Sequence, residues 1–151
     1  MKSQNNNPIG IFDSGIGGIS ILKTAHRIMP NENFIYFSDF ANIPYGNKPI
    51  NFIHKRCDYI TEYLISKRVK IIVIACNTAT ASSIDRLRKK YQIPFVGVEP
   101  AIKPATKITK NQKIAIMATG LTTSSVRISE LIKKQNPKIK IIVTPCYDLV
   151  E

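Results

Sequence analysis

Short runs of β-branched and apolar residues alternate with longer amphipathic segments along this sequence. Such alternation is typical of βαβ units, in which right-handed helical crossovers join parallel strands. We expect strands over residues 9–13, 34–37, 70–75, 95–98, 113–118 and 139–143. We expect helices over residues 19–29, 50–66, 101–108 and 123–134, and one that follows the 76–78 turn and ends near residue 91. The pattern therefore predicts an α/β fold with a doubly wound parallel sheet.

The proline-containing stretch from Pro94 to Pro104 divides this pattern and predicts a hinge between two lobes. Residues 1–98 form the first α/β lobe, and residues 99–151 form the start of a second one. One strand, one helix and one strand make a small unit for a separate hydrophobic core. We expect an incomplete second lobe, which either docks on the first lobe or belongs to a longer chain.

Composition excludes several classes of protein. Hydrophobic residues make up 44% of the 151 residues, too many for general disorder. The longest apolar run, Ile71 to Cys76, is far shorter than the roughly 20 residues of a membrane span, and residues 1–8 lack a secretory signal. Three cysteines, odd in number and without zinc-ligand spacing, disfavour a disulfide framework and a metal site. We expect a cytoplasmic protein without a membrane association.

The formal net charge of +12 leaves the partner open. A basic chain of this size suits a nucleic acid or an anionic substrate. The lysines are dispersed, and the sequence carries no zinc-finger, RRM or KH signature and no aromatic platform for single strands. These observations disfavour nucleic acid; the charge is equally compatible with an anionic substrate and does not by itself decide the partner.

Polar residues follow four of the expected strands. They are Asp13-Ser14-Gly15, Asp39 with Pro44-Tyr45-Gly46, Cys76-Asn77-Thr78, and the segment from Thr119 to Thr122. In open α/β sheets, ligands bind outside the carboxyl ends of the strands. We expect these segments to share one rim that collects an acid, a thiol and many hydroxyl and amide donors.

Cys76, at a strand-to-helix turn, is the sharpest candidate for chemistry. The positive end of the following helix stabilises a thiolate and offers N–H groups to a carboxylate ligand, although a small buried cysteine that merely ends a strand has the same pattern. Asp13 suits a general base or a residue that orients one, or a cap of the next helix. The glycines at 15, 17 and 18 do not fit the dinucleotide fingerprint. Cys57, within a helix, is expected to be partly buried and inert.

Four segments together resemble the glutamate racemases of the Asp/Glu racemase superfamily. They are IGIFDSGIGG at 9–18, PYG at 44–46, VIACNTA at 73–79, and VGV at 96–98 followed by PAIKPA at 100–105. The resemblance implies a cofactor-independent interconversion of L- and D-glutamate that supplies D-glutamate for peptidoglycan. It gives Cys76 the role of one of two catalytic cysteines and Asp13 the role of the acid that assists it. The resemblance also implies a set of substrate-binding residues: Ser14, Pro44, Tyr45, Gly46, Asn77, Thr78, Thr119 and Thr122.

The sequence departs from the family pattern in two places. The family's second cysteine lies in a downstream Gly-Cys-Thr-His motif, which these 151 residues do not contain, and neither Cys57 nor Cys146 has that context. Ser124-Ser125-Val126-Arg127 replaces a family segment rich in Tyr or Lys. We therefore expect this chain to be inactive alone. Three alternatives remain: a non-catalytic binding or regulatory module whose partner is an acidic protein, DNA or gyrase; an aspartate racemase; and a homo-oligomer that completes the cleft.

Overall fold

Four parallel strands in the order β2-β1-β3-β4 form the sheet of the first lobe in this computed structural model, which describes residues 6–147. The strands are β1 (Ile9–Asp13), β2 (Phe34–Ser38), β3 (Ile71–Ile74) and β4 (Phe95–Gly97). Between them lie α1 (Ile19–Ile28), α2 (Ile50–Ser66) and α3 (Asn77–Lys90), with two short 3₁₀ turns, η1 (Phe40–Asn42) and η2 (Tyr45–Asn47). All carboxyl ends of the strands point to the same edge of the sheet.

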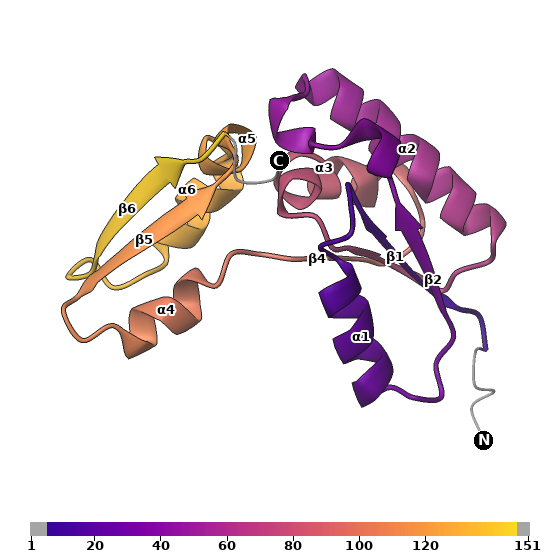
Figure 1. Ribbon diagram of the computed structural model, residues 1–151, viewed down its shortest axis with the longest axis horizontal. Helices are drawn as coiled ribbons and strands as arrows, with labels where there is room; N and C mark the ends of the chain where they lie inside the picture. Colours follow the sequence, from indigo (N-terminus) through magenta and orange to yellow (C-terminus); the bar gives the residue numbers. More distant parts are fainter. Residues whose placement is uncertain (1–5, 148–151) are drawn as a thin grey trace.

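Helices cover both faces of this sheet (Figure 1). Ile21 and Leu22 of α1 pack on the face that carries Ile9 and Ile11. Apolar residues of α2 and α3 form the larger core on the other face; they include Ile53, Ile60, Leu64, Ile84 and Leu87. Every residue of β1 is buried, because this strand lies inside the sheet between β2 and β3. The doubly wound parallel sheet is confirmed.

The second lobe contains the parallel pair β5 (Lys113–Ala118) and β6 (Lys140–Pro145), with α4 (Ile102–Ile108), α5 (Gly120–Thr123) and α6 (Val126–Lys133). Its core, built around Ile102, Ile116 and Ile128, lies on one face of the strands. Met117 and Ile142 are exposed on the opposite face. A two-stranded sheet with one face open matches the expected incomplete second lobe.

Strands β1 and β5 and helix α2 have the expected bounds, and most other ends lie within two residues of the expected positions. The helix expected over 123–134 is wrong in its first residues: α6 begins at Val126, and a separate short helix, α5, precedes it. Each of the two helices begins at its own cap. Thr119 Oγ1 accepts a hydrogen bond from the N–H of Thr122 at 3.4 Å and begins α5. Ser125 Oγ accepts one from the N–H of Ile128 at 3.3 Å and begins α6. Hydroxyl side chains favour the cap over the helix interior, so the Thr- and Ser-rich sequence forms two short helices.

No helix within residues 6–147 has the length and apolar character needed to cross a membrane. The same residues contain no group of three or more His, Cys, Asp or Glu side chains arranged to hold a metal ion.

Candidate active site

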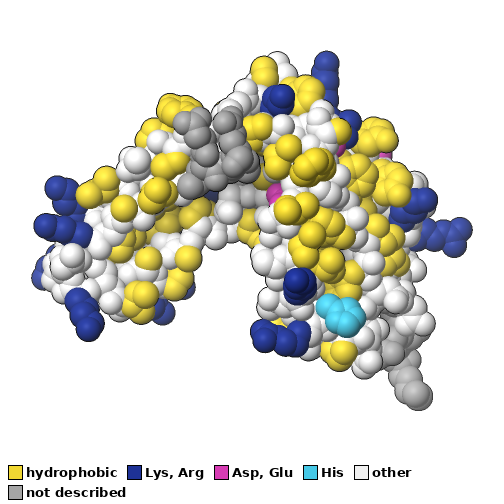
Figure 2. Space-filling model, viewed as in Figure 1, with side chains coloured by type: hydrophobic (Ala, Val, Ile, Leu, Met, Phe, Trp, Pro, Cys, Tyr) yellow, Lys and Arg dark blue, Asp and Glu magenta, His cyan; other side chains and the backbone are white. Residues whose placement is uncertain are grey.

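A cavity of about 1100 Å³ lies between the two lobes, at the carboxyl ends of β1, β3 and β5. Figure 2 shows the surface hollowed between the lobes. The structure brings to the lining of this cavity all the residues to which the family resemblance gives a role: Asp13, Ser14, Pro44, Tyr45, Gly46, Cys76, Asn77, Thr78, Thr119 and Thr122. Asp39, which was also expected at this rim, is not part of the lining. The remaining lining is largely apolar and includes Ile21, Val98, Ile102, Ala105 and Met117. One region of the cavity is therefore suited to a small polar ligand.

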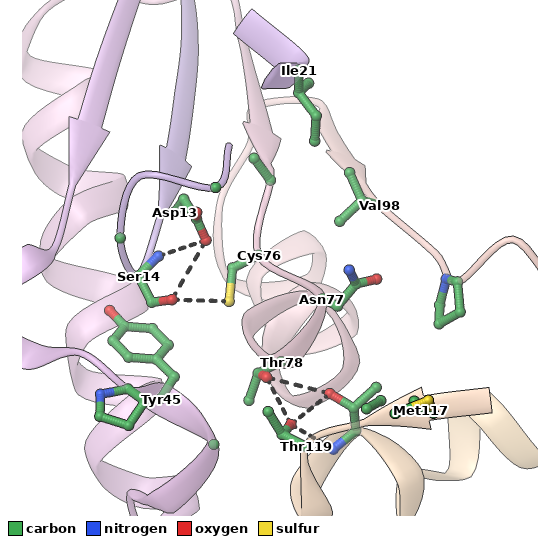
Figure 3. Close-up of a pocket in the computed structure, with 18 of the residues that line it drawn as sticks. Asp13, Ser14, Ile21, Tyr45, Cys76, Asn77, Thr78, Val98, Met117 and Thr119 are labelled. Atoms are coloured by element: carbon green, nitrogen blue, oxygen red, sulfur yellow. Dashed lines mark hydrogen bonds between the residues drawn. The ribbon is translucent and has the colours of Figure 1, made fainter. Parts of the chain in front are cut away.

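Ser14 links Cys76 to Asp13 (Figure 3). The thiol of Cys76 donates to Ser14 Oγ at 3.5 Å, and Ser14 Oγ donates to Asp13 Oδ1, also at 3.5 Å. The distance from sulfur to oxygen is ordinary for a thiol donor, whereas the distance from Ser14 Oγ to Asp13 Oδ1 is long for a hydroxyl hydrogen bond and leaves room for a small adjustment when a ligand enters. The three side chains are nearly fully buried, so the path from sulfur to carboxylate is shielded from bulk water. This arrangement can move a proton between a thiol and a carboxylate through a hydroxyl.

Asp13 also holds the glycine-rich turn that follows β1. Its Oδ1 accepts the N–H of Ser14 and its Oδ2 accepts the N–H of Gly18, each at 2.8 Å. A Cβ on Gly18 would lie 2.7 Å from the Cβ of Ala75, so the turn reaches this position only with glycine. Asp13 thus holds the turn before α1, and within residues 6–147 the structure shows no side-chain hydrogen bond that caps the helix itself. The contact with Ser14 Oγ keeps the role of a general base, or of a residue that orients one, available.

Cys76 is the N-cap of α3, and its sulfur accepts the N–H of Ala79 at 3.4 Å. The N–H of Ala79 at the helix end stabilises the thiolate, as expected, but other contributions to the pKa of Cys76 are larger. Burial raises the pKa of the Cys76 thiol above its ordinary value and, with the nearby charge of Asp13, outweighs the hydrogen bonds from Ala79 and Ser14. In this state of the cavity the thiol form is favoured, and the thiolate needs a proton acceptor such as the Ser14–Asp13 path.

The Pro44-Tyr45-Gly46 loop is held by a buried carboxylate. Asp39 accepts the Tyr45 hydroxyl at 2.6 Å, Arg56 Nε at 2.9 Å and Nη2 at 2.6 Å, and Asn42 Nδ2 at 2.9 Å. Burial alone would raise the pKa of Asp39, but the hydrogen bonds from Arg56, Tyr45 and Asn42 outweigh it and lower that pKa. Burial and the bond to Asp39 raise the pKa of Tyr45, so its hydroxyl stays protonated and bound to Asp39. The loop therefore offers its backbone, rather than the Tyr45 hydroxyl, to a ligand.

Replacing Arg56 by methionine is expected to lower the free energy of unfolding of the full-length protein by about 2–3 kcal/mol at neutral pH, because Asp39 loses charged hydrogen-bond donors while it stays buried. A lowered folded-state pKa stabilises the protein above the unfolded-state value of about 3.9 and ceases to do so as pH falls through the folded value. The difference between the wild type and the variant should therefore shrink as Asp39 is protonated. Urea unfolding at several pH values measures it, and Lys55→Met, an exposed substitution on the same helix, is the control. Equal effects of the two substitutions would contradict the assignment.

Hydroxyl groups join the two lobes beside the cavity. Thr78 of α3 lies 2.9 Å from Thr119 and 3.3 Å from Thr122, oxygen to oxygen, and Thr119 and Thr122 lie 3.0 Å apart. A Cβ on Gly46 would lie 2.6 Å from Thr119 Cγ2, so the η2 turn approaches the second lobe this closely because residue 46 has no side chain. The lobes thus meet through small polar groups at the cavity wall.

The other cysteines lie away from the cavity. Cys57 is fully buried in the core, more than expected, and burial raises the pKa of its thiol to about 12, which makes it unreactive. Cys146 follows β6 and is partly exposed, and all three cysteines are unpaired. Two residues around the site were missed by the sequence reasoning: Arg56, which lies 17 positions from Asp39, and Arg127, whose contacts are described below. No local sequence signal marks such distant pairs.

A sequence model described as Asp/Glu/Hydantoin racemase matches residues 20–148. The chain belongs to this racemase family. Within the family, the glutamate racemase of Clostridium acetobutylicum is 47% identical over 150 residues, which are 99% of this chain and 59% of that protein. The glutamate racemase of Clostridium botulinum strain Alaska E43 is 47% identical over 149 residues, 98% of this chain and 58% of the relative.

Solved racemase structures share the fold described above. Escherichia coli glutamate racemase in complex with L-glutamate and the activator UDP-MurNAc-Ala superposes with a TM-score of 0.83 at 34% identity, over 95% of this chain and 55% of that one. Francisella tularensis glutamate racemase in complex with D-glutamate gives a TM-score of 0.77 at 40% identity, over 93% of this chain and 53% of that one. The chain thus spans little more than half the length of the racemases it matches.

Proposed function

We propose that the full-length protein interconverts L- and D-glutamate without a cofactor, with Cys76 as the acid–base group for one face of the substrate. The observation that carries the proposal is the buried path from the Cys76 thiol through Ser14 to Asp13 at the cavity wall. The glutamate racemases at 47% identity support glutamate as the substrate.

In the proposed step, Cys76 first passes its proton toward Asp13 and becomes a thiolate. The thiolate then takes the proton from Cα: the C–H bond breaks, an S–H bond forms, and the electron pair remains at Cα, delocalised into the carboxylate. A proton delivered to the opposite face completes the inversion, so no oxidant or reductant is consumed. We assign the opposite face to no group within residues 6–147; the family resemblance gives it to a second cysteine.

The proposed substrate contacts follow from the donors at the rim. Asn77 and Thr78 begin α3, where backbone N–H groups have no helical carbonyl partner and favour a carboxylate. The hydroxyls of Thr78, Thr119 and Thr122 and the backbone of Tyr45 and Gly46 can hold the substrate's carboxylate groups. Asp13 and Ser14 suit the ammonium group. Donors fixed around the carboxylate also stabilise the charge that develops on it when Cα is deprotonated.

Two further statements belong to this proposal. We place the boundary between the lobes at residues 98 and 99, where the chain leaves β4 and passes to α4. We also place the protein in the cytoplasm, because the proposed reaction needs Cys76 as a free thiol, and reducing compartments preserve free thiols.

The test is incubation of the full-length protein with L- or D-glutamate in D2O, with a chelator and no added cofactor, followed by circular dichroism and proton NMR. The expected result is inversion of either enantiomer with deuterium gained at Cα, and slower or no turnover of aspartate. The 151-residue chain alone is expected to exchange the proton on one face at most, without inversion. Absence of turnover with glutamate, or preference for aspartate, would contradict the proposed substrate. Full racemisation by the 151-residue chain would contradict the need for a second group beyond it.

A further inference from the structure

Arg127 crosses from the second lobe to the first. It lies near the start of α6, and its Nη2 donates to Glu99 in the segment that joins β4 to α4. Its Nη1 lies 3.9 Å from Asp85 Oδ1 on α3. The guanidinium thus connects α6, to which Arg127 belongs, with the connecting segment and with α3 of the first lobe.

The stability of α6 does not explain this position. A cation in the first turn of a helix faces the positive end of the helix dipole, which disfavours it. The Nε of Arg127 is also buried without a hydrogen-bond partner in the described part of the chain. Both features are unfavourable within α6, so the side chain is held in place by its acidic partners, Glu99 in the connecting segment and Asp85 on α3 of the first lobe.

The contact around Arg127 is closely packed and adjoins the active-site cavity. A space of only about 10 Å³ remains between Arg127, Thr80 of α3, Glu99 and Leu131. Thr122 borders both this contact and the cavity. The side chain of Ser125, which caps α6, donates to the carbonyl of Thr122 at 2.7 Å, so the start of α6 is joined to the Thr122 turn.

We infer that Arg127 is a positioning residue for the proposed substrate site: its ion pairs hold α6 against α3 and the connecting segment, and thereby place the Thr119 and Thr122 hydroxyls opposite Thr78. The inference rests on the proposed function, because it assigns those hydroxyls to the substrate. Arg127 itself lies outside the lining of the cavity and touches no reacting atom.

The test is Arg127→Met in the full-length protein, with Arg88→Met as the matched control. Arg88 lies on α3, is 3.8 Å from the same Asp85 carboxylate and donates to the carbonyl of Phe95 at 2.9 Å, all within the first lobe. Arg127→Met is expected to raise KM for glutamate about three- to tenfold and to change kcat less than about twofold, because it weakens placement of the binding hydroxyls and leaves Cys76 untouched. Arg88→Met is expected to leave both constants unchanged.

A charge exchange tests whether the ion pair itself acts. Arg127→Glu alone places like charges opposite Glu99 and should raise KM further, and the double variant Arg127→Glu with Glu99→Arg should restore most of the affinity. The inference would be overturned if Arg127→Glu lowered kcat and the thermal midpoint together and the double variant recovered neither KM nor kcat. Arg127 would then have a purely structural role.

Hydrogen–deuterium exchange of the ligand-free proteins separates this inference from the proposed function, since it needs no turnover. Arg127→Met should speed amide exchange in α5 and the 98–101 segment while β1 to β4 stay protected, and Arg88→Met should not. If Arg127→Met exchanges faster in α5 but the wild-type protein does not racemise glutamate, the positioning role of Arg127 is retained and the proposed substrate is refuted. If Arg127→Met keeps the KM and the α5 exchange rate of the wild type, the positioning role of Arg127 is refuted and the proposed function is retained.

Discussion

Replacing Cys76 by serine in the full-length protein is expected to lower glutamate racemisation at least about a thousandfold, because a serine hydroxyl is far too weak an acid to form the base that the reaction needs. The side chain at position 76 would still accept the N–H of Ala79 and cap α3, so folding should be retained. Polarimetry of each enantiomer measures the loss, and NMR in D2O measures exchange at Cα.

Two cysteines provide matched controls for this substitution. Cys57→Ser and Cys146→Ser change the same atom outside the cavity and should keep racemisation within about twofold of the wild type, even if Cys57→Ser lowers stability. Cys76→Ser should also abolish exchange for one enantiomer while the other can still exchange without inversion. Racemisation that persists in Cys76→Ser would remove Cys76 from the mechanism.

Replacing Asp13 by asparagine should have the second largest effect, a loss of turnover of about a hundredfold or more, because the Cys76–Ser14 path then ends on a group that takes up no proton. The same variant should make the Cys76 thiol more acidic, since the negative charge of Asp13 contributes to raising the pKa of Cys76. If Asp13 acted only through its charge, the more acidic thiol would not lose turnover. A more acidic thiol together with slower turnover would therefore indicate that Asp13 accepts the proton. The rate of Cys76 alkylation against pH measures the acidity, with its half-maximal point expected at lower pH in Asp13→Asn.

Asparagine can keep one of the two turn contacts of Asp13, so the fold of the 14–18 turn is checked by the thermal midpoint. Glu130→Gln, which removes an exposed carboxylate of α6, serves as the control and should change neither turnover nor alkylation. An Asp13→Asn variant with full turnover would exclude the relay.

Much of the fold and the site could be predicted from sequence because both depend on local patterns. The runs around residues 9–13 and 70–75 are apolar and end in polar turns, and parallel strands bring such turns to one edge. This reasoning placed Asp13, Cys76 and Thr119 on one cavity. The error in the 123–134 helix came from hydroxyl side chains that act as caps. These side chains compete with the helical hydrogen bonds, and the spacing of apolar residues carries no information about that competition.

The remaining features depend on contacts that no local pattern encodes. The pKa of Cys76 is raised mainly because the thiol is buried, and burial of that degree is set by the tertiary structure. Arg56 reaches Asp39 across 17 residues, and Arg127 reaches Glu99 across 28. On sequence alone, such arginines look like ordinary solvated charges.

The hydroxyl contact between Thr78, Thr119 and Thr122 has a thermodynamic consequence for ligand entry. In the ligand-free protein these three groups satisfy one another, so the cavity wall needs no ligand to be hydrogen-bonded. A carboxylate that enters takes over the donated hydrogens and replaces a direct link between the lobes by one that runs through the ligand itself. The affinity for the ligand and the interaction between the lobes then depend on the same few hydrogen bonds. A change that strengthens the direct contact between the lobes therefore also changes the affinity for the ligand.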